Sequence, residues 1–483
     1  MNVEASRAVS VDLHVSLSGQ RQVSGQVYRQ IRDAILEGRL RAHEALPSSR
    51  ELARRLQLSR NTVLLVYERL RAEGFLVTRV GAGTFVSEGI QPRSPVAPAG
   101  SPLRARALWD DIPDGPDMSA TRPEFDFRPG IPDASRFPFA SWRARVSREL
   151  HHHTVGTGAH IGAAGHPKLR TAIARHIGVS RAVRATSDDV FVTNGSQQAI
   201  DLIARVLLER GDVVAVEDPC YPLPRRTFQA HECRVVGVPV DADGLIVDAI
   251  PRDARLVYVT PSHQYPLGMA MSLARRQALL TWAQQADASI IEDDYDSEFR
   301  YDGRPLESLQ SLDASGRVLY VGSLSKVMLP TLRLGFVVAP VPLHAALRKA
   351  KFLADWHTAV PSQAAAAQFI DDGLLAQHVR RMRRVYAGRH DRIVEILSRD
   401  LAGRLTPLPS SGGLHLAALL PERDDVRDRL IAQRAYAAGI AVLPLSNHYI
   451  GQRQRPGLLI GYGAIPSERI EQGLRRLSDC LGV

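Results

Sequence analysis

The sequence GSLSKVMLPTLRLG, residues 322–335, contains Lys326, one of only four lysines beside 57 arginines in this 483-residue chain. Because arginine supplies nearly all of the positive charge, a lysine here indicates chemistry that a guanidinium does not perform. An ε-amino group can lose its proton and attack an aldehyde, whereas arginine stays protonated. The apolar runs at 318–321 and 334–338 predict that the segment is buried. They argue against the alternative, a surface lysine in a loop.

The residues around Lys326 suit a phosphate. Ser323 and Ser325 offer hydroxyl donors, and Arg333 offers a planar charged fork for a dianion. Pyridoxal 5′-phosphate combines an aldehyde with a phosphate. We therefore expect Lys326 to bind this cofactor.

Apolar runs alternate with helical patterns through the rest of the chain after residue 188. The expected strands are 189–193, 213–216, 256–260, 289–292, 318–322 and 335–338, and the expected helices include 197–208 and 273–285. This alternation indicates a mostly parallel sheet covered on both faces, and ligands of such sheets bind beyond the carboxyl ends of the strands. Polar groups follow the runs in chain order: Asn194-Gly195-Ser196-Gln197, Glu217 to Tyr221, Thr260 to Gly268, and Glu292-Asp293-Asp294-Tyr295.

Three helices and a short β-hairpin are expected in the first 86 residues. Apolar residues at helical spacing predict a first helix over 21–39. A serine before Arg50 and Ser59 predict the starts of two shorter helices, the second running to Gly74. Two short helices joined by a tight turn form a helix-turn-helix unit, and 75–86 has the pattern of two strands around a glycine turn, a wing.

The stretch LPSSRELARRLQLSRNTVLLVYERLRAEGFLVTRVGAGTFV, residues 46–86, resembles the winged helix-turn-helix of the GntR class of bacterial regulators, without a gap. The resemblance implies that the domain binds double-stranded DNA, with the start of the recognition helix in contact with it and the wing tip in the minor groove. The implied DNA-binding residues are Arg50, Ser59, Arg60, Asn61, Thr62 and Gly81. Residues 1–90 hold 13 arginines and 9 acids, so their charge adds only local support. The alternative is an interaction module with solvated arginines.

From about residue 125 to 480, the polar groups and Lys326 resemble, in their order, the fold-type I aminotransferases. The resemblance implies that Lys326 carries pyridoxal 5′-phosphate as an internal aldimine and is the catalytic residue. It implies that Asp293 pairs with the pyridine nitrogen, although Glu292 and Asp294 remain alternatives. The other implied cofactor contacts are Tyr295 on the ring hydroxyl, Tyr221 stacked on the ring, and Gly195, Ser196, Gln197, Ser323, Ser325 and Arg333 on the phosphate. His263 and Gln264 are further candidates near the ring hydroxyl.

The chain is therefore expected to be multidomain: a small winged helix-turn-helix domain (1–86), a Pro-, Ala- and Gly-rich linker (87–122), and a large α/β fold-type I aminotransferase-like domain (123–483). This arrangement resembles the MocR subfamily of bacterial transcription regulators. The resemblance implies a head-to-tail homodimer and an effector that is an amine, an amino acid or pyridoxal phosphate itself.

The competing hypothesis is a working aminotransferase with an appended DNA-binding domain. Enzymes of this fold hold the substrate carboxylate with an arginine on a strand near the C-terminus. The corresponding strand here, PGLLIGY at 456–462, has no arginine, although Arg453 and Arg455 lie just upstream. This absence favours a sensor over an efficient enzyme.

Composition sets the remaining expectations. The net charge of +10 is a mild indication of a polyanionic partner. Three cysteines without metal spacing, no long apolar run and no basic-then-apolar N-terminus predict a cytoplasmic protein without disulfides, metal site or membrane contact. We interpret the run His151-His152-His153 as a helical face, because adjacent helical residues do not converge on one ion.

Overall fold

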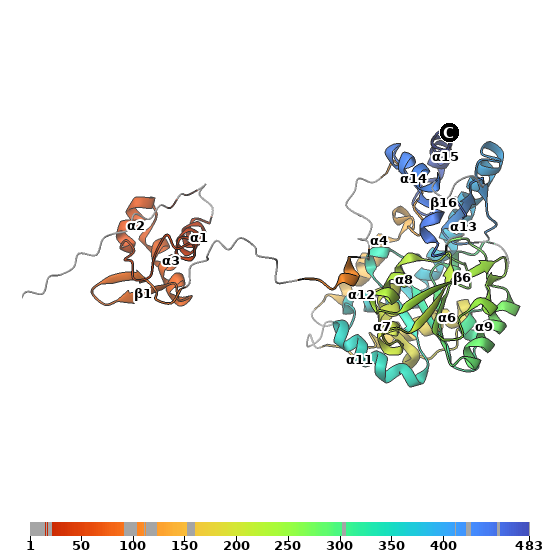
Figure 1. Cartoon of the computed structure of the whole chain (residues 1–483), viewed down its shortest axis with the longest axis horizontal. Helices are drawn as coiled ribbons and strands as arrows, with labels where there is room; N and C mark the ends of the chain where they lie inside the picture. Colours follow the sequence, from red (N-terminus) through yellow and green to blue (C-terminus); the bar gives the residue numbers. More distant parts are fainter. Residues whose placement is uncertain are drawn as a thin grey trace, which may run out of the picture. The chain divides into compact units, whose positions relative to one another are not determined.

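The structure is a computed structural model that describes residues 15, 17, 22–90, 104–110, 112, 123–151, 160–301, 306–410, 412–421, 427–451 and 455–482. The chain divides into two compact units, Met1–Arg106 and Ala107–Val483 (Figure 1). The division falls inside the expected linker, whose described part includes a short 3-10 turn at Ala107–Trp109.

The small unit is a three-helix fold with a β-hairpin, as the sequence predicts. Its elements are α1 (Val23–Leu36), α2 (Ser49–Leu56), α3 (Arg60–Ala72), β1 (Leu76–Arg79) and β2 (Gly83–Val86). The hydroxyls of Ser48 and Ser59 accept hydrogen bonds from the backbone N–H of Glu51 at 3.2 Å and Thr62 at 3.1 Å, which caps α2 and α3. The apolar faces of the helices form a separate core with Leu76 and Val86.

The large unit is built on an eight-stranded sheet. In spatial order its strands are β4 (Val190–Thr193), β11 (Gly335–Val338), β10 (Val318–Ser323), β9 (Ser289–Asp294), β8 (Ala254–Val259), β5 (Val213–Asp218), β6 (Arg234–Asp241) and β7 (Gly244–Leu245). Strands β10, β9, β8, β5 and β6 are parallel, whereas β11 runs antiparallel to both neighbours. The six predicted strands are all present. The carboxyl ends of the parallel strands therefore meet at one edge of the sheet.

Helices cover both faces of this sheet, because successive strand residues point to opposite sides. On β10, Leu319 and Val321 pack with α7 (Ser196–Leu207), α8 (Pro222–Ala230) and α11 (His344–Asp355). The alternate residues Val318 and Tyr320 pack in the cores that contain α9 (Leu273–Gln285) and α6 (Pro167–Arg181). Burial on both faces explains why the strands are continuous apolar runs.

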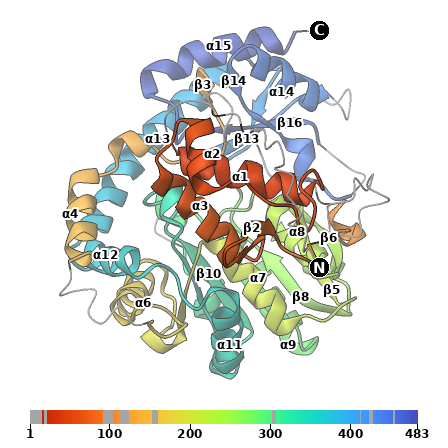
Figure 2. The same ribbon diagram turned by 90° about the vertical axis from the view of Figure 1, so that its left-hand side faces the viewer.

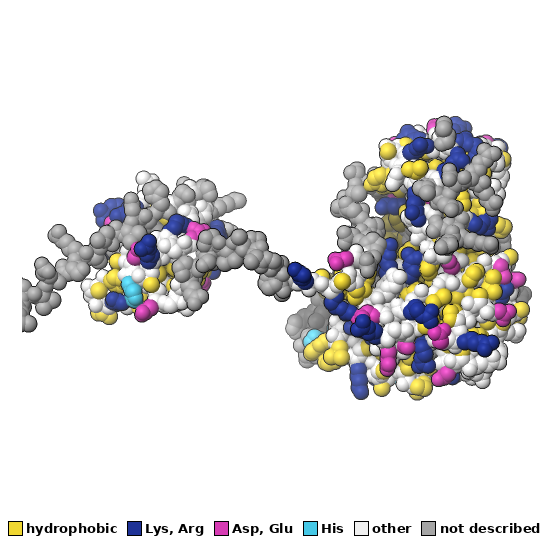
Figure 3. Space-filling model, viewed as in Figure 1, with side chains coloured by type: hydrophobic (Ala, Val, Ile, Leu, Met, Phe, Trp, Pro, Cys, Tyr) yellow, Lys and Arg dark blue, Asp and Glu magenta, His cyan; other side chains and the backbone are white. Residues whose placement is uncertain are grey.

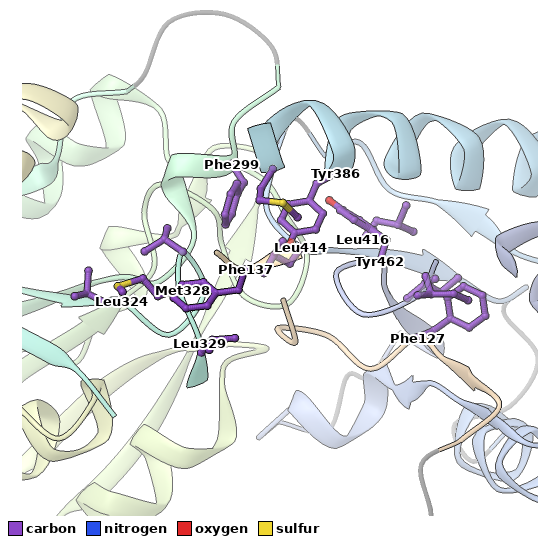
Figure 4. Packing of buried hydrophobic residues seen from close by; sticks show 14 of the residues in the cluster. Phe127, Phe137, Phe299, Leu324, Met328, Leu329, Tyr386, Leu414, Leu416 and Tyr462 are labelled. Atoms are coloured by element: carbon purple, nitrogen blue, oxygen red, sulfur yellow. The ribbon is translucent and has the colours of Figure 1, made fainter. Parts of the chain in front are cut away.

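A second, antiparallel sheet near the C-terminus has the order β12 (Thr406–Pro407), β13 (His415–Leu419), β16 (Gly457–Gly461), β15 (Leu443–Pro444). Figure 2 shows α14 (Arg427–Ala437) and α15 (Ile470–Cys480) beside it. One apolar core joins this sheet to the segment around Lys326, with Leu324 and Met328 in the same cluster as Leu416 and Tyr462 (Figure 4). The remaining elements are α4 (Phe139–Glu149), α10 (Leu309–Leu312), α12 (Val360–Asp371), α13 (Leu374–Asp400), and β3 (Phe125–Asp126) paired with β14 (Ile440–Ala441).

Two further expectations concern membrane-spanning helices and the histidine run 151–153. In the described part of the chain, no helix has the length and apolar character needed to cross a bilayer. His151 is exposed just after α4, whereas His152 and His153 lie outside the described residues.

Candidate functional site

A cavity of about 330 Å³ lies at the carboxyl ends of the parallel strands, at the small end of the usual range for ligand pockets. It brings together nine of the ten predicted cofactor-binding residues: Lys326, Asp293, Tyr295, Tyr221, Ser196, Gln197, Ser323, Ser325 and Arg333. The tenth, Gly195, is the N-cap residue of α7, next to the Arg333 guanidinium. Residues from four separate parts of the chain thus converge as the strand order predicts.

Lys326 lies in the cavity with its amino group held against the backbone. Its Nζ donates a hydrogen bond to the Gly130 carbonyl at 2.6 Å. A Cβ at Gly130, where φ is 74°, would lie 2.7 Å from Nζ, so a side chain at this position would displace the lysine. Burial lowers the pKa of Lys326, although the carboxylates of Asp296 and Asp293 oppose the shift. A lower pKa favours the neutral, nucleophilic amine.

The three consecutive acids at the end of β9 have three different environments. Both oxygens of Glu292 accept backbone N–H groups, from Leu309 and Gln310 at 2.8 Å each, so Glu292 caps α10. Asp294 is buried and accepts from the Arg181 guanidinium at 2.7 Å. Asp293 alone lines the cavity. Strand alternation therefore separates the candidates that the sequence left open.

Asp293 has one oxygen available for a ligand. Its Oδ2 accepts a hydrogen bond from the Tyr258 hydroxyl at 2.6 Å, while its buried Oδ1 has no partner among the described residues. Burial raises the pKa of Asp293 to about 6. A buried acceptor without a partner is costly, and a protonated ring nitrogen would satisfy it.

The other end of the cavity is lined by hydrogen-bond donors. Ser196 and Gln197 open α7, whose first backbone N–H groups are free to bind an anion. Arg333 donates from Nη2 to the Asn194 carbonyl at 2.8 Å, which fixes its guanidinium beside this helix end. A Cβ at Gly195 would lie 2.6 Å from the same Nη2. Ser323 and Ser325 also line this cavity. The donor set suits a phosphate.

Two lining residues, Thr260 and Tyr265, belong to the polar segment 260–268 that the sequence indicated without singling them out, whereas Tyr258 and His415 were missed by sequence reasoning. His263 and Gln264, the sequence candidates, do not line this cavity. Gln264 instead donates to the Pro219 carbonyl at 2.8 Å, and it is the next residue, Tyr265, that lines the cavity. A tyrosine within an apolar strand was a usable signal for Tyr258. His415 enters from the second sheet, which no local pattern indicates.

Tyr295 and Tyr221 lie in the cavity, with different contacts. The Tyr295 hydroxyl donates to the His263 carbonyl at 3.0 Å and lies 2.9 Å from Nδ1 of the same histidine. The Tyr221 ring meets the Tyr265 ring edge to face, with centroids 5.2 Å apart. Tyr221 therefore has an aromatic neighbour within the cavity wall.

A buried polar cluster adjoins the cavity. One ring nitrogen each of His263 and His415 and one carboxylate oxygen of Asp296 lie within 4.8 Å of one another, a grouping that the sequence did not indicate. His263 Nδ1 is 3.1 Å from Asp296 Oδ1, and His415 Nε2 is 3.2 Å from the Pro266 carbonyl. Hydrogen bonds within the chain thus engage both histidines. We interpret the cluster as a hydrogen-bonded network.

The segment 456–462, which contains no arginine, forms strand β16, and this strand is wholly buried. Leu459 packs with Leu267, Ala417 and Leu445, and the partly buried Tyr265 lies against this cluster. Arg455 is exposed, and Arg453 lies outside the described residues.

The predicted DNA-binding residues lie on α2, at the start of α3 and on the wing, and most of them are exposed. Arg50, Ser59, Arg60 and Asn61 are exposed, and Thr62 is partly buried. Among the described residues, neither Arg50 nor Arg60 has a hydrogen-bond or ion-pair partner. Gly81 lies in the wing turn with φ of 77°, a conformation that glycine adopts without strain. On the visible face of the large unit, basic and acidic side chains are interspersed (Figure 3).

Comparison with known proteins gives matches for both units. Residues 23–86 match the gntR family of bacterial regulatory proteins, and residues 131–477 match the class I and II aminotransferases. The chain is 35% identical to the probable rhizopine catabolism regulatory protein MocR of Rhizobium meliloti, over 94% of this chain and 92% of that protein. It is 31% identical to the pyridoxine biosynthesis regulator PdxR of Corynebacterium glutamicum, over 98% and 99%.

The large unit also matches solved structures. The kynurenine aminotransferase of Pyrococcus horikoshii, solved with pyridoxamine phosphate, is 26% identical with a TM-score of 0.69, covering 79% of this chain and 95% of that one. The cavity therefore lies in a fold that enzymes of this class use.

Proposed function

This chain belongs to the MocR-type, GntR-family transcription regulators, and on that basis we propose that its large domain binds pyridoxal 5′-phosphate and an effector that together set operator affinity. One observation carries the proposal. A half-buried lysine, Lys326, and a buried carboxylate oxygen without a partner among the described residues, Asp293 Oδ1, share a cavity whose other end is lined by hydrogen-bond donors. Aldehyde, ring nitrogen and phosphate are the three groups that these features complement.

Each end of the cofactor would be held by groups of this chain. Lys326 would bind the aldehyde carbon, Asp293 the pyridine nitrogen, and Arg333 with the start of α7 the phosphate. Tyr221 would stack on the ring, and the Tyr295 hydroxyl would hydrogen-bond the ring hydroxyl. When bound, the cofactor supplies an electrophilic carbon that forms a covalent bond with a primary amine.

The small domain would contact the operator through Arg50, Ser59, Arg60, Asn61, Thr62 and Gly81. The guanidinium groups of Arg50 and Arg60, which have no partner among the described residues, support this assignment, because arginine pairs with guanine edges and with phosphates. For the effector to alter DNA binding, it must bind the DNA-competent and DNA-incompetent conformations with different affinity. A coupling of about 1 to 3 kcal/mol is typical.

We propose a homodimer, head-to-tail as the family resemblance implies. An exposed apolar patch at the C-terminal end of α11 supports self-association: Phe352, Leu353 and the C-cap residue Trp356 are 47%, 81% and 45% exposed. Leu353→Glu should lower the dimer's stability in sedimentation experiments. An unchanged dimer would place the interface elsewhere.

The test uses full-length protein, its visible spectrum, and a DNA fragment from the gene's own upstream region. The protein should be yellow after incubation with pyridoxal phosphate, and ligands that alter the spectrum should change operator affinity. It should form little or no keto acid from common amino acids. A colourless protein would refute cofactor binding. Fast transamination without any effect on DNA binding would favour the enzyme hypothesis.

A further inference from the structure

The cavity offers little to a second anion. Among the described residues that line it, the cationic side chains are Lys326 and Arg333. In the proposed function, both are used by the cofactor, one at its aldehyde end and the other at its phosphate. Among these described residues, an effector carboxylate would therefore meet no cationic side chain that the cofactor leaves free, and a carboxylate that leaves water without a cation is unfavourable.

Near β16, the cavity wall consists of Tyr265 with an apolar cluster behind it. Tyr265 lines the cavity and packs against the cluster of Leu459, Leu267, Ala417 and Leu445. Leu459 is fully buried, so this wall has no room for a charged group on that strand. The nearby histidines do not supply the charge, because burial lowers the pKa of His448 to about 4 and that of His415 well below its usual value.

His415 gives the wall a specific polarity. A carbonyl oxygen only accepts, so the contact of His415 Nε2 with the Pro266 carbonyl places the proton on Nε2. Nδ1 is then an acceptor, and this buried atom has no partner among the described residues. Since His415 lines the cavity, a ligand hydroxyl could donate to it, whereas a carboxylate would meet an acceptor.

We propose that the effector is a small primary amine that carries a hydroxyl group and no carboxylate, with His415 Nδ1 accepting a hydrogen bond from the hydroxyl. This inference rests on the proposed function, since the cofactor occupies Lys326 and Arg333. It narrows the effector from amines and amino acids in general to amino alcohols and aminated polyols. The cavity volume of about 330 Å³, shared with the cofactor, keeps the ligand small.

The test compares three ligands of one carbon skeleton on the cofactor-loaded, full-length protein: 2-aminoethanol, ethylamine and glycine. The readouts are the ligand concentration for half-maximal change in thermal midpoint and in operator affinity. We expect 2-aminoethanol to act at roughly tenfold lower concentration than ethylamine, and glycine to act weakest. L-alaninol, isopropylamine and L-alanine should repeat this order.

Variants identify the residue responsible. His415→Phe should bring 2-aminoethanol to the level of ethylamine, and His415→Asn, which keeps an acceptor, should restore part of the preference. The matched control is His378→Phe on α13, also a buried histidine but outside the cavity wall, and it should leave the ligand order unchanged.

Each outcome decides the inference. Glycine at or above the potency of 2-aminoethanol, or no difference between 2-aminoethanol and ethylamine, overturns it while the proposed function stands. A loaded protein that responds to none of the six ligands also overturns it. A protein that takes up no cofactor overturns both proposals. The wild-type comparison remains decisive if His415 variants fail to fold.

Discussion

The winged helix and the region beside the cavity both contain an arginine–carboxylate pair, but the two pairs lie in opposite environments. On α2, Arg55 and Glu51 lie 2.7 Å apart with side chains about 40% exposed, at 41% and 39%. Next to the cavity, Arg181 and Asp294 lie at the same distance, with exposures of 4% and 1%. Equal geometry therefore has unequal consequences, because solvent screens the first pair and the protein interior does not screen the second.

The comparison explains how each region can recognise its ligand. Exposed arginines on the small domain can exchange water for DNA phosphates and bases at little cost. Buried polar groups that line the cavity have lost their water, so they need hydrogen-bond partners within the protein or on a ligand. Among the described residues, the Oδ1 atom of Asp293 and the Nδ1 atom of His415 have no hydrogen-bond partner.

The largest expected effect is the loss of Lys326. Lys326→Ala should abolish the visible absorbance of the cofactor-loaded protein and the effect of ligands on operator affinity, because the covalent link is gone. DNA binding by the winged helix should remain. The control Lys349→Ala removes an exposed lysine of α11 and should keep the colour. If Lys326→Ala keeps the visible absorbance of the cofactor-loaded protein, the cofactor is linked to another residue.

The two ion pairs test the contrast directly. Asp294→Ala should lower the free energy of unfolding of the large domain by about 3 to 5 kcal/mol, because Arg181 is left buried and unpaired. Glu51→Ala should cost the small domain only about 0.2 to 1 kcal/mol. Both values come from urea titrations of the respective transitions. Similar costs for the two variants would contradict the role we give to burial.

Replacement of the exposed arginines should act on DNA alone. Arg50→Ala or Arg60→Ala should weaken operator binding by about 1 to 3 kcal/mol if the side chain contacts a base. A side chain that contacts a phosphate should instead reduce the dependence on salt. Fluorescence anisotropy at several salt concentrations separates the two, and the visible spectrum should stay constant. Unaltered affinity in both variants at matched salt would place the recognition surface elsewhere.

The last effect concerns the pH dependence of stability without the cofactor. Burial raises the pKa of Asp293 from 3.8 to about 6, so between these values the folded state binds more protons than the unfolded state. Stability therefore falls as pH rises through this window and stays lower above it. Asp293→Asn should stabilise the cofactor-free protein by about 1 to 3 kcal/mol at pH 7, and the gain should vanish near pH 4.

Urea unfolding at both pH values measures this gain. Asp479→Asn, an exposed acid on α15, is the control and should show no such difference. A destabilised Asp293→Asn at pH 7 would mean that the carboxylate has a partner that we have missed.

Sequence predicted the features that follow from local pattern. The periodicity of 21–39 and the apolar runs such as 318–322 gave elements close to their final bounds, because burial on one or both faces fixes that pattern. The order of polar groups after strands also placed Lys326 and Asp293 in one cavity, since parallel strands end at one edge.

The sequence could not place groups that depend on tertiary contacts. His415 reaches the cavity from β13, whose pairing with β16 has no local signal. Tyr265, not His263 or Gln264, lines the cavity because the conformation of the loop 260–268 decides which side chain turns inward. The choice among Glu292, Asp293 and Asp294 needed the sheet's faces.

The run of three acids on β9 also bears on how this site tolerates insertions and deletions. A shift of β9 by one residue would still present a carboxylate to the cavity, Glu292 or Asp294, because all three positions are acidic. It would nevertheless separate Arg181 from its partner and uncap α10. Glu292 and Asp294, which face away from the cavity, therefore fix which residues of β9 point into it. An insertion or deletion in β9 would destabilise the fold even where a carboxylate still faced the cavity.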